Sequence, residues 1–490
     1  MASVLSRVSK KIAMSAKIKV LLVFLLVPFW IYLRGVYRDR LGAFGCFDDC
    51  FNIVAGYFIG QGKQLYSEIF FNHQPILAYI SALIQYFYQP QSIYELIYRH
   101  RMVLIGYFAA ADMFLTLRFG LIGFAFALLF ETTKGFLFGE RFLAESMIVY
   151  PLVYLFALVL QRKRIHPMES AATAFATWFV VFSREPYIPL ALFLFVVILY
   201  KTYSKVALMI FVLVTLATLA LFDFRSYWWN LVTVNAQAAS EELNWSIFFY
   251  PVAVYFGGNW NLFRWIEVIL SGLILLTFWR TGWKRALLVF LTLGLANIRT
   301  VAPGTLYYVA FHHLVWYAVA IFVVLLQTKL GWIAIGWLAL LAFLSPQSYL
   351  HENVNRAEQF GIGYGHYIMQ GEIIRRLSDP TNTLFLELWD DLIYLQAKLP
   401  SAYKYSWYTS SMANFSIYRA AREEMFRDYP PDFYYGQCSK NGEISLRNDD
   451  YIRLTQGKTP TCIFVKKAVV SYISDERWIT VRDFSIDKPQ

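Results

Sequence analysis

Charged side chains are scarce in this sequence. Asp, Glu, Lys and Arg together make up 16% of its 490 residues, whereas hydrophobic residues make up 58% and aromatic residues 19%. Soluble domains carry about 25% charged residues, so this composition excludes an ordinary soluble protein of this length. Aromatic residues are enriched where a membrane meets water. We therefore predict a polytopic membrane protein.

Acidic residues are fewer than basic ones, 33 against 44, and the formal net charge is +11. In membrane proteins Lys and Arg gather in cytoplasmic loops, so this excess does not indicate nucleic acid as a partner. The sequence also lacks an internal repeat and low-complexity tracts. The missing repeat disfavours a transporter built from two symmetric halves.

Cysteine is rare, and its spacing is not that of a zinc site. The four residues are Cys46, Cys50, Cys438 and Cys462. All four fall in segments that we expect outside the cytoplasm, where disulfides form. A Cys46–Cys50 bridge would clamp Asp48 and Asp49, which lie between them; two unpaired cysteines one helical turn apart are the alternative.

Eleven apolar segments are candidates for membrane-spanning helices, which need about 20 residues. They lie at residues 20–37, 97–117, 119–136, 143–160, 170–183, 187–200, 205–222, 264–280, 284–298, 304–326 and 330–345. If the chain alternates sides from a cytoplasmic N-terminus, short basic connections such as QRKRIH at 161–166 fall in the cytoplasm, as the positive-inside rule requires. We predict a polytopic all-α membrane domain of about eleven transmembrane helices over residues 1–345.

The remaining segments are expected on the outer side. The first outer loop covers residues 38–99, and its apolar part, HQPILAYISALIQYFY at 73–88, is too short to span and fits a helix lying at the interface. The tail, residues 346–490, alternates strand-like runs such as TCIFVKKAVVSYI with helical ones such as IYRAAREEMFRDY. This alternation predicts a C-terminal extracytoplasmic α/β domain.

Ionisable residues gather on the predicted outer face, many of them in short loops that join spans. They are Asp48, Asp49, Glu68, His73, Glu140, Arg141, Glu145, Arg184, Glu185 and Arg299. Such residues at membrane depth cost several kcal/mol unless paired or wetted, so they indicate function by default. A group-transfer enzyme needs a carboxylate that takes a proton from an acceptor hydroxyl, and positive charge near the leaving group.

The cations suit a phosphate leaving group, because a guanidinium can hold phosphate bidentately. Arg184 and Arg299 are the candidates; pairing with Glu185 or contact with lipid headgroups is their alternative interpretation. His312 and His313 are neighbours, so on a helix they point to different faces and do not form a paired metal site. One of them can bind a lipid phosphate or a substrate hydroxyl, or be a packed polar residue.

The first outer loop resembles that of GT-C fold glycosyltransferases, most closely the glycosyltransferase 39-like group of protein O-mannosyltransferases and aminoarabinose lipid A transferases. That group shows an acid after the first span and then a G-x-x-L-Y-x-D/E stretch followed by proline. Here these features read Asp48-Asp49, GKQLYSE at 62–68 and NHQP at 72–75. GERFLAES at 139–146 stands at the family's second acidic position, and LWDDLIYLQAKLPSAYKYSW at 388–407 and YPPDFYY at 429–435 resemble parts of its outer domain.

The resemblance implies an enzyme that transfers a sugar from a polyprenyl-phosphate donor to a glycan, lipid or protein acceptor at the outer face of a membrane, with inversion. Asp48 or Asp49 would be the base; Glu140, Glu145 and Glu68 are candidates for a second acidic site. Lys63, His73 and His312 join Arg184 and Arg299 as candidates for binding the donor phosphate or the substrate.

Many members of this group need no metal, whereas some GT-C enzymes use a divalent cation held by two acidic loops, and we assign no metal ligand. The expected location is a bacterial inner or cell membrane, in contact with membrane lipids. A lipid-linked glycan ligase or polymerase and a lipid or sugar transporter are the alternatives, and a structural role is a weaker one.

The predicted topology places residues 46–75 outside the cytoplasm. A cysteine introduced there, as in Lys63→Cys, should react in intact cells with a maleimide that does not cross membranes. A cysteine in the basic connection, as in Arg162→Cys, should gain label only after permeabilisation. Labelling of the first variant only after permeabilisation would contradict both the topology and the proposed chemistry.

Overall fold

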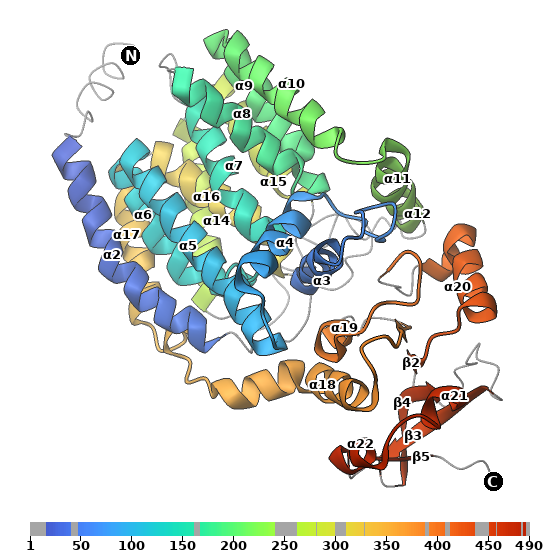
Figure 1. The fold of residues 1–490 in the computed structure, drawn as a ribbon. Coiled ribbons are helices and arrows are strands. Elements are labelled where there is room, and N and C mark those ends of the chain that lie inside the picture. Colours follow the sequence, from blue (N-terminus) through green and yellow to red (C-terminus); the bar gives the residue numbers. More distant parts are fainter. Residues whose placement is uncertain are drawn as a thin grey trace.

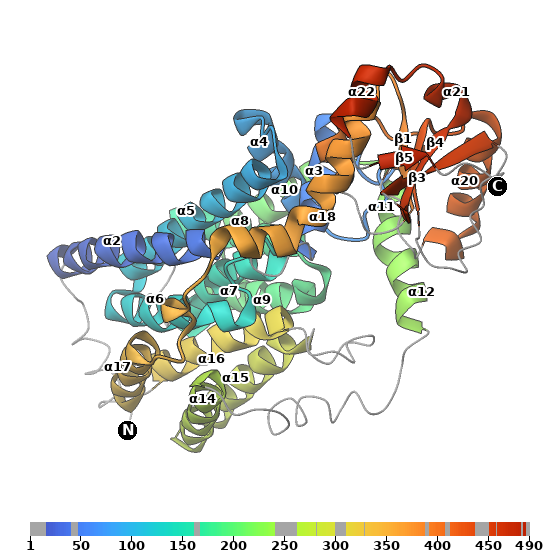
Figure 2. The ribbon, with the colours of Figure 1, turned by 90° about the horizontal axis from the view of Figure 1, so that it is seen from below.

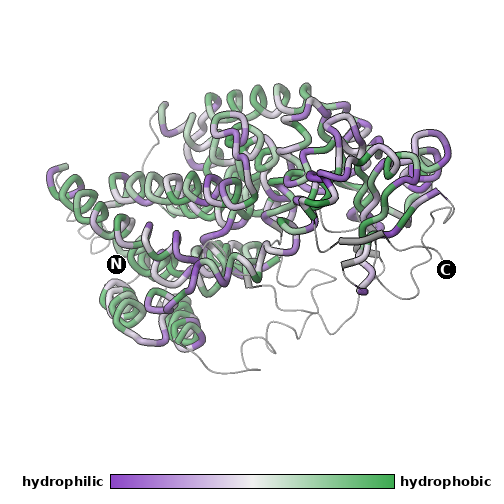
Figure 3. The backbone as a smooth tube through the Cα atoms, turned by 60° about the horizontal axis from the view of Figure 1, so that its bottom comes forward, coloured by the Kyte–Doolittle hydropathy of each residue, from purple (hydrophilic) through white to green (hydrophobic). Residues whose placement is uncertain are grey.

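The chain is described here from a computed structural model, which covers residues 16–40, 48–160, 167–240, 262–280, 282–298, 310–327, 329–387, 392–406, 412–436, 450–456, 458–481 and 484–486. Helices dominate these residues and form a bundle, with a small sheet domain at the C-terminal end of the chain (Figure 1). Hydrophobic residues predominate along the bundle helices, and hydrophilic residues are more frequent in the C-terminal domain (Figure 3).

Each predicted apolar segment overlaps a helix of the bundle, because a run of apolar residues has few breakers and can satisfy its backbone internally. The bundle helices are α2 (Ala16–Asp39), α5 (Ile93–Phe119), α6 (Leu121–Thr133), α7 (Ala144–Leu160), α8 (Pro167–Val181), α9 (Ile188–Thr202), α10 (Lys205–Leu219), α14 (Leu262–Arg280), α15 (Trp283–Ala296), α16 (Leu314–Gln327) and α17 (Lys329–Leu344). Short helical turns accompany them: η1 (Lys134–Leu137), η2 (Glu185–Tyr187), η6 (Ala310–His313) and η7 (Tyr349–His351).

The number of transmembrane helices differs from the prediction of about eleven. Among the described helices, five are long and apolar enough to cross a membrane, or six if the pair Lys205–Leu219 and Phe224–Gln237, bent by 100°, is one span. The five are Ala16–Asp39, Ile93–Phe119, Glu185–Thr202, Leu262–Trp279 and Gly331–His351. At 1.5 Å per residue, helices of 13–17 residues such as α6 and α7 reach only about 20–26 Å, less than a hydrocarbon core of about 30 Å.

Between α2 and α5 the chain forms two short helices, α3 (Asp48–Gly60) and α4 (Ile76–Tyr88), which pack against each other. The helix predicted over residues 73–88 is thus present. Gly56 permits the close approach, because an added Cβ would lie 2.5 Å from Ser81 Oγ and 2.7 Å from the backbone nitrogen of Ala82. The outward side of α4 leaves Leu83, Tyr86 and Phe87 exposed.

A second polar connection follows α10, and it is held to the first one. It contains α11 (Phe224–Trp228), the π-helical turn η3 (Trp229–Thr233) and α12 (Val234–Ser240). Buried Asn230 accepts a hydrogen bond from the Phe71 backbone nitrogen (3.1 Å) and donates one to the Tyr66 carbonyl (3.1 Å). The amide therefore fixes the loop between α3 and α4 against this connection.

The C-terminal domain confirms the predicted alternation of helices and strands. Its helices are α18 (Arg356–Leu377), α19 (Leu392–Ala397), η8 (Met412–Asn414), α20 (Ser416–Asp428), α21 (Lys467–Val470) and α22 (Asp475–Thr480). Its strands are β1 (Leu384–Leu386), β2 (Phe433–Tyr435), β3 (Tyr451–Gln456), β4 (Thr459–Lys466) and β5 (Phe484–Ile486). Over the described residues the sheet order is β1-β2-β4-β3-β5, with β1 and β2 parallel and the other pairs antiparallel.

The C-terminal domain lies at the end of the bundle that carries α3, opposite the start of α2 (Figure 2). Hydrogen bonds join it to the loop after α3: Phe70 donates its backbone N–H to the Tyr405 carbonyl (3.1 Å), and Lys63 Nζ donates to the carbonyls of Tyr403 (3.3 Å) and Lys404 (3.4 Å). The first loop is therefore enclosed between the bundle and the C-terminal domain.

Packing of α3 on α4 can be tested at Gly56. Gly56→Ala should lower the free energy of unfolding by about 1–3 kcal/mol, because its Cβ meets the backbone of α4. The matched control is Gly60→Ala on the same helix, where a Cβ has nothing within 4 Å. Denaturant titration in detergent measures both, and equal midpoints for the two variants would contradict the close approach.

Candidate functional site

The end of the bundle that faces the C-terminal domain contains several buried ionisable side chains. They come from the first turn of α3, the beginnings of α5 and α7, and the turns just before α7 and α9. These are the places where the sequence predicts outer loops. Two groups lie here, the Asp49 cluster and the Glu145 cluster. A third, the Glu131 cluster, lies within the bundle.

The Asp49 cluster centres on an ion pair. Asp49, in the first turn of α3, lies 3.2 Å through Oδ2 from Nη2 of Arg101 on α5, and their side chains are 0% and 3% exposed. The N-terminus of a helix favours a carboxylate, because its backbone N–H groups and dipole attract negative charge. Loss of either partner would leave the other charge buried and uncompensated.

Arg141, in the turn before α7, adds a second guanidinium to the Asp49 cluster. Burial lowers the pKa of Arg141, the negative charges of Asp49 and Glu140 oppose this effect, and the positive charge of Arg101 adds to it. Tyr364 of α18 approaches from the C-terminal domain, and burial raises the pKa of Tyr364 to about 12. The cluster thus joins three parts of the chain: the first loop, the turn before α7 and α18.

Glu140 extends this cluster toward the end of α2. Its Oε1 lies 3.9 Å from Nε of Arg40. Arg40 also pairs with Glu352, and its guanidinium carbon lies 5.1 Å from the ring centroid of Tyr349. The Asp49 cluster is defined as Asp49, Glu140, Arg40, Arg101 and Arg141. With Glu352 on Arg40, three guanidinium groups face three carboxylates, so an anionic ligand would bind here by replacing a carboxylate partner.

The Glu145 cluster lies beside the first. Arg184 donates from Nε to Oε1 of Glu145 at 2.8 Å, and its Nη1 lies 2.9 Å from Nδ1 of His73. A guanidinium only donates, so the His73 ring nitrogen accepts this hydrogen bond. The His73 ring also packs 6.2 Å from the ring of Phe51 on α3, which places this cluster next to the turn that holds Asp49.

Arg184 is hydrogen-bonded to Glu145, and its charge also acts on Glu185, the partner that the sequence suggested. Glu185 lies 3.9 Å through Oε2 from Nδ1 of His73. The structure therefore brings together Glu145, Arg184 and His73, which the sequence had placed in three separate outer segments.

The Glu131 cluster lies within the bundle and was missed by the sequence reasoning. Lys134 Nζ lies 2.6 Å from Oε2 of Glu131 and donates to the Tyr150 hydroxyl (3.0 Å), which itself bonds to Glu131. Asp112 of α5 is fully buried, and its carboxyl group interacts electrostatically with both Glu131 and Lys134. The missed signal was local: ionisable residues such as Asp112 and Arg101 interrupt the apolar segment at 97–117.

Other predicted site residues lie away from these clusters. Lys63 donates to the carbonyls of Tyr403 and Lys404, so its ammonium holds the C-terminal domain. Glu68 accepts from the backbone nitrogen of Gln64 at 2.8 Å and closes the turn after α3. The His312 carbonyl accepts from the Tyr187 hydroxyl (3.1 Å) at the start of α16.

Asp48 is the first residue of α3, but its side chain lies outside the described residues. Arg299 lies outside them entirely. Cys50 takes part in a disulfide, and so does Cys462. Cys46 and Cys438 fall outside the described residues. The alternative in which Cys50 is unpaired is therefore wrong.

Within the described part of the chain, no three His, Cys, Asp or Glu side chains come together as a set of metal ligands. Comparison with family models, curated proteins and solved structures finds no significant match to the chain. The function must therefore be argued from these clusters and from the resemblance of the first loop.

The buried Asp49–Arg101 pair can be tested by removing one partner. Arg101→Met should lower the free energy of unfolding by about 3–5 kcal/mol, because Asp49 would remain buried without its cation. The double variant Asp49→Leu with Arg101→Met should recover much of this loss, because no lone charge remains. Both are measured by denaturant titration in detergent.

The control for this test is Arg427→Met. Arg427 pairs with Asp428 at 2.9 Å on the exposed side of α20, where solvent screens the interaction, so the unfolding midpoint should hardly move. Equal shifts for Arg101→Met and Arg427→Met would show that the buried pair is not a structural requirement.

Proposed function

We propose that this chain is a membrane glycosyltransferase that moves a sugar from a polyprenyl-phosphate donor to an acceptor hydroxyl at the outer face of the membrane. One observation carries the proposal. Two buried carboxylates, Asp49 and Glu145, come from the two loops where the resemblance expects acids, and each is held by an arginine at the same end of the bundle.

The reaction that this arrangement supports is a single displacement at the anomeric carbon. A carboxylate, Asp49 or its neighbour Asp48, takes the proton of the acceptor hydroxyl. The hydroxyl oxygen then forms the new bond to the anomeric carbon while the bond from that carbon to the phosphate oxygen breaks. Attack from the face opposite the leaving group inverts the configuration.

The leaving polyprenyl phosphate needs positive charge at the membrane surface. The first candidate is Arg141 of the Asp49 cluster, which lies in the turn just before α7. Arg184 is the second candidate, because it is already oriented by Glu145. A phosphate that binds here would exchange a carboxylate partner for a phosphate partner, which a planar guanidinium fork accommodates.

In this proposal the bundle has the GT-C architecture that the resemblance implies. The helices too short to span by length alone, such as α6 and α8, then also lie within the membrane, packed against neighbouring helices of the bundle. The N-terminus is then cytoplasmic, and the C-terminal domain covers the active site from outside.

Asp49 and Glu145 each already contact a guanidinium, at 3.2 Å and 2.8 Å, so a divalent cation held by both acids would have to replace these partners. No step of the proposed reaction passes through a metal.

A lipid or sugar transporter is the second candidate, and the Glu131 cluster is the observation that favours it. Ionisable groups inside an apolar bundle are typical of proton and substrate pathways. The two functions differ in their requirements. A transferase depends on Asp49 or Asp48, whereas a transporter depends on Glu131 or Asp112.

The base is tested by Asp48→Asn and Asp49→Asn, each in the full chain. Transfer of radiolabelled sugar from polyprenyl-phosphate donors into lipid, glycan and protein fractions should fall by about 10²–10⁴-fold in one of the two variants, because the general base is lost. The control is Asp428→Asn, an exposed acid on α20, which should keep full transfer.

Protein abundance and the unfolding midpoint are measured for every variant, so that loss of fold is distinguished from loss of chemistry. Full transfer in both Asp48→Asn and Asp49→Asn at normal abundance would contradict the assignment of the base. Full transfer in these variants together with loss of transport in Glu131→Gln would favour the transporter.

A further inference from the structure

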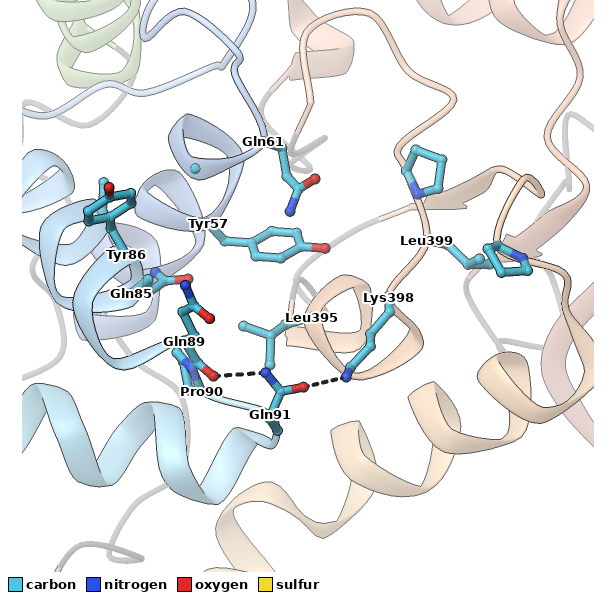
Figure 4. A pocket seen from close by; sticks show the side chains of 14 residues that line it. Tyr57, Gln61, Gln85, Tyr86, Gln89, Pro90, Gln91, Leu395, Lys398 and Leu399 are labelled. Carbon is cyan, nitrogen blue, oxygen red and sulfur yellow. Dashed lines mark hydrogen bonds between the residues drawn. The ribbon is translucent and has the colours of Figure 1, made fainter.

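A pocket of about 570 Å³ opens between the first loop and the C-terminal domain. The end of α3, the end of α4 and the turn that follows it form one wall, and α19 with its following turn forms the other (Figure 4). It is distinct from the three clusters, because none of their residues lines it. Its lining joins segments about 300 residues apart in the chain, so it exists only when the two parts are docked.

The lining mixes amide and hydroxyl groups with leucine and proline side chains. Among the described residues that line the pocket, none is Asp or Glu, whereas four are glutamines and two are tyrosines. The lysine of the pocket, Lys398, donates to Oε1 of Gln91 at 2.9 Å, which orients its ammonium without compensating its charge. Gln85 is fixed by a hydrogen bond to the Ile53 carbonyl (2.8 Å) and supports the wall.

Three side chains of the lining are suited to hydrogen-bond a ligand. Gln61 and Gln89 are exposed at the rim, and each amide both donates and accepts. Tyr57 extends from α3 into the space between the two walls (Figure 4). Burial raises the pKa of Tyr57 to about 12, so its hydroxyl stays protonated and can donate. The pocket therefore offers a flat ring together with groups that donate and accept hydrogen bonds.

We propose that this pocket binds the neutral, polyhydroxylated glycan part of the acceptor. Sugar rings carry hydroxyl groups that both donate and accept, and apolar C–H faces that pack on aromatic rings, which are the features that Tyr57, Gln61 and Gln89 complement. A polyprenyl chain would leave the amide groups of the lining without hydrogen-bond partners, and a phosphate would meet only one cation of the lining, Lys398. This inference rests on the proposed glycosyltransferase and names its acceptor class.

The position of the pocket agrees with this role. Tyr57 follows Asp49 by eight residues on α3, which at 1.5 Å per residue is about 12 Å along the helix. One helix thus carries the candidate base near its beginning and the pocket near its end. A chain of several sugars held at Tyr57 could present its terminal hydroxyl near Asp49.

The test measures binding separately from catalysis. The full chain, purified in detergent, is applied to immobilised tetrasaccharides of glucose, mannose, galactose and N-acetylglucosamine, and any that bind are titrated in solution. Gly60→Trp places a large side chain in the pocket, and a Cβ at Gly60 has open space around it, so α3 should fold normally. We expect binding to weaken more than about tenfold because the space is filled.

Tyr57→Phe provides a second, milder variant that keeps the ring. Loss of the hydroxyl should weaken binding about three- to tenfold, the usual effect of one hydrogen bond. Gly60→Ala, which adds only a methyl group, and Gln347→Ala, an exposed glutamine outside the pocket, should bind as the unchanged chain does.

Binding to no tetrasaccharide, or binding that Gly60→Trp and Tyr57→Phe both leave unchanged, would overturn the proposal. Absent binding combined with sugar transfer that depends on Asp48 or Asp49 would refute the glycan pocket and leave the transferase in place. Binding that Gly60→Trp abolishes, in a chain that transfers sugar from no donor, would support the pocket and refute the transferase.

Discussion

Burial of charge in an apolar bundle is the constraint on which the rest of this structure depends. Taking a carboxylate and a guanidinium out of water costs several kcal/mol per ion, and only close pairing offsets that cost. Asp49 and Arg101 meet this requirement, and by doing so they fix α3 to α5. Arg184 and Glu145 do the same between the beginnings of α9 and α7. The loops at this end of the bundle are therefore positioned by the same groups that are proposed to act on substrate.

Much of the fold followed from local sequence patterns, whereas the partners of the ionisable residues did not. Apolar runs located the bundle helices, the short helix after His73 and the strand β4 of the tail, because hydrophobic patterning is a property of neighbouring residues. The strand predicted from the run TCIFVKKAVVSYI ends earlier than that run, because Lys467–Val470 form the helix α21. The number of spans was overestimated, because an apolar run does not reveal where turns such as η1 shorten a helix. The partner of Arg184 was also missed, because the contact with Glu145 joins residues on different helices. Asp112 could have been found as an acid in an apolar run, but its neighbours Glu131 and Lys134 required the fold.

The helix α3 unites the features on which the proposed function rests. Its first turn holds Asp49, its middle lies against α4 through Gly56, and its end forms part of the pocket wall. A small displacement of α3 would change the Asp49–Arg101 distance and the width of the pocket together. The packing at Gly56 therefore affects both the proposed base and the proposed acceptor site, although Gly56 lies at neither.

Closure of the first loop by the C-terminal domain has a consequence for biosynthesis. Lys63 finds its partner Tyr403 only 340 residues later in the chain. At a synthesis rate of about 5–20 residues per second, the loop waits roughly 20–70 s after it emerges before that partner exists. During this interval the loop is not covered by the C-terminal domain, and the pocket between them does not exist. The proposed acceptor site is therefore complete only when translation is nearly finished.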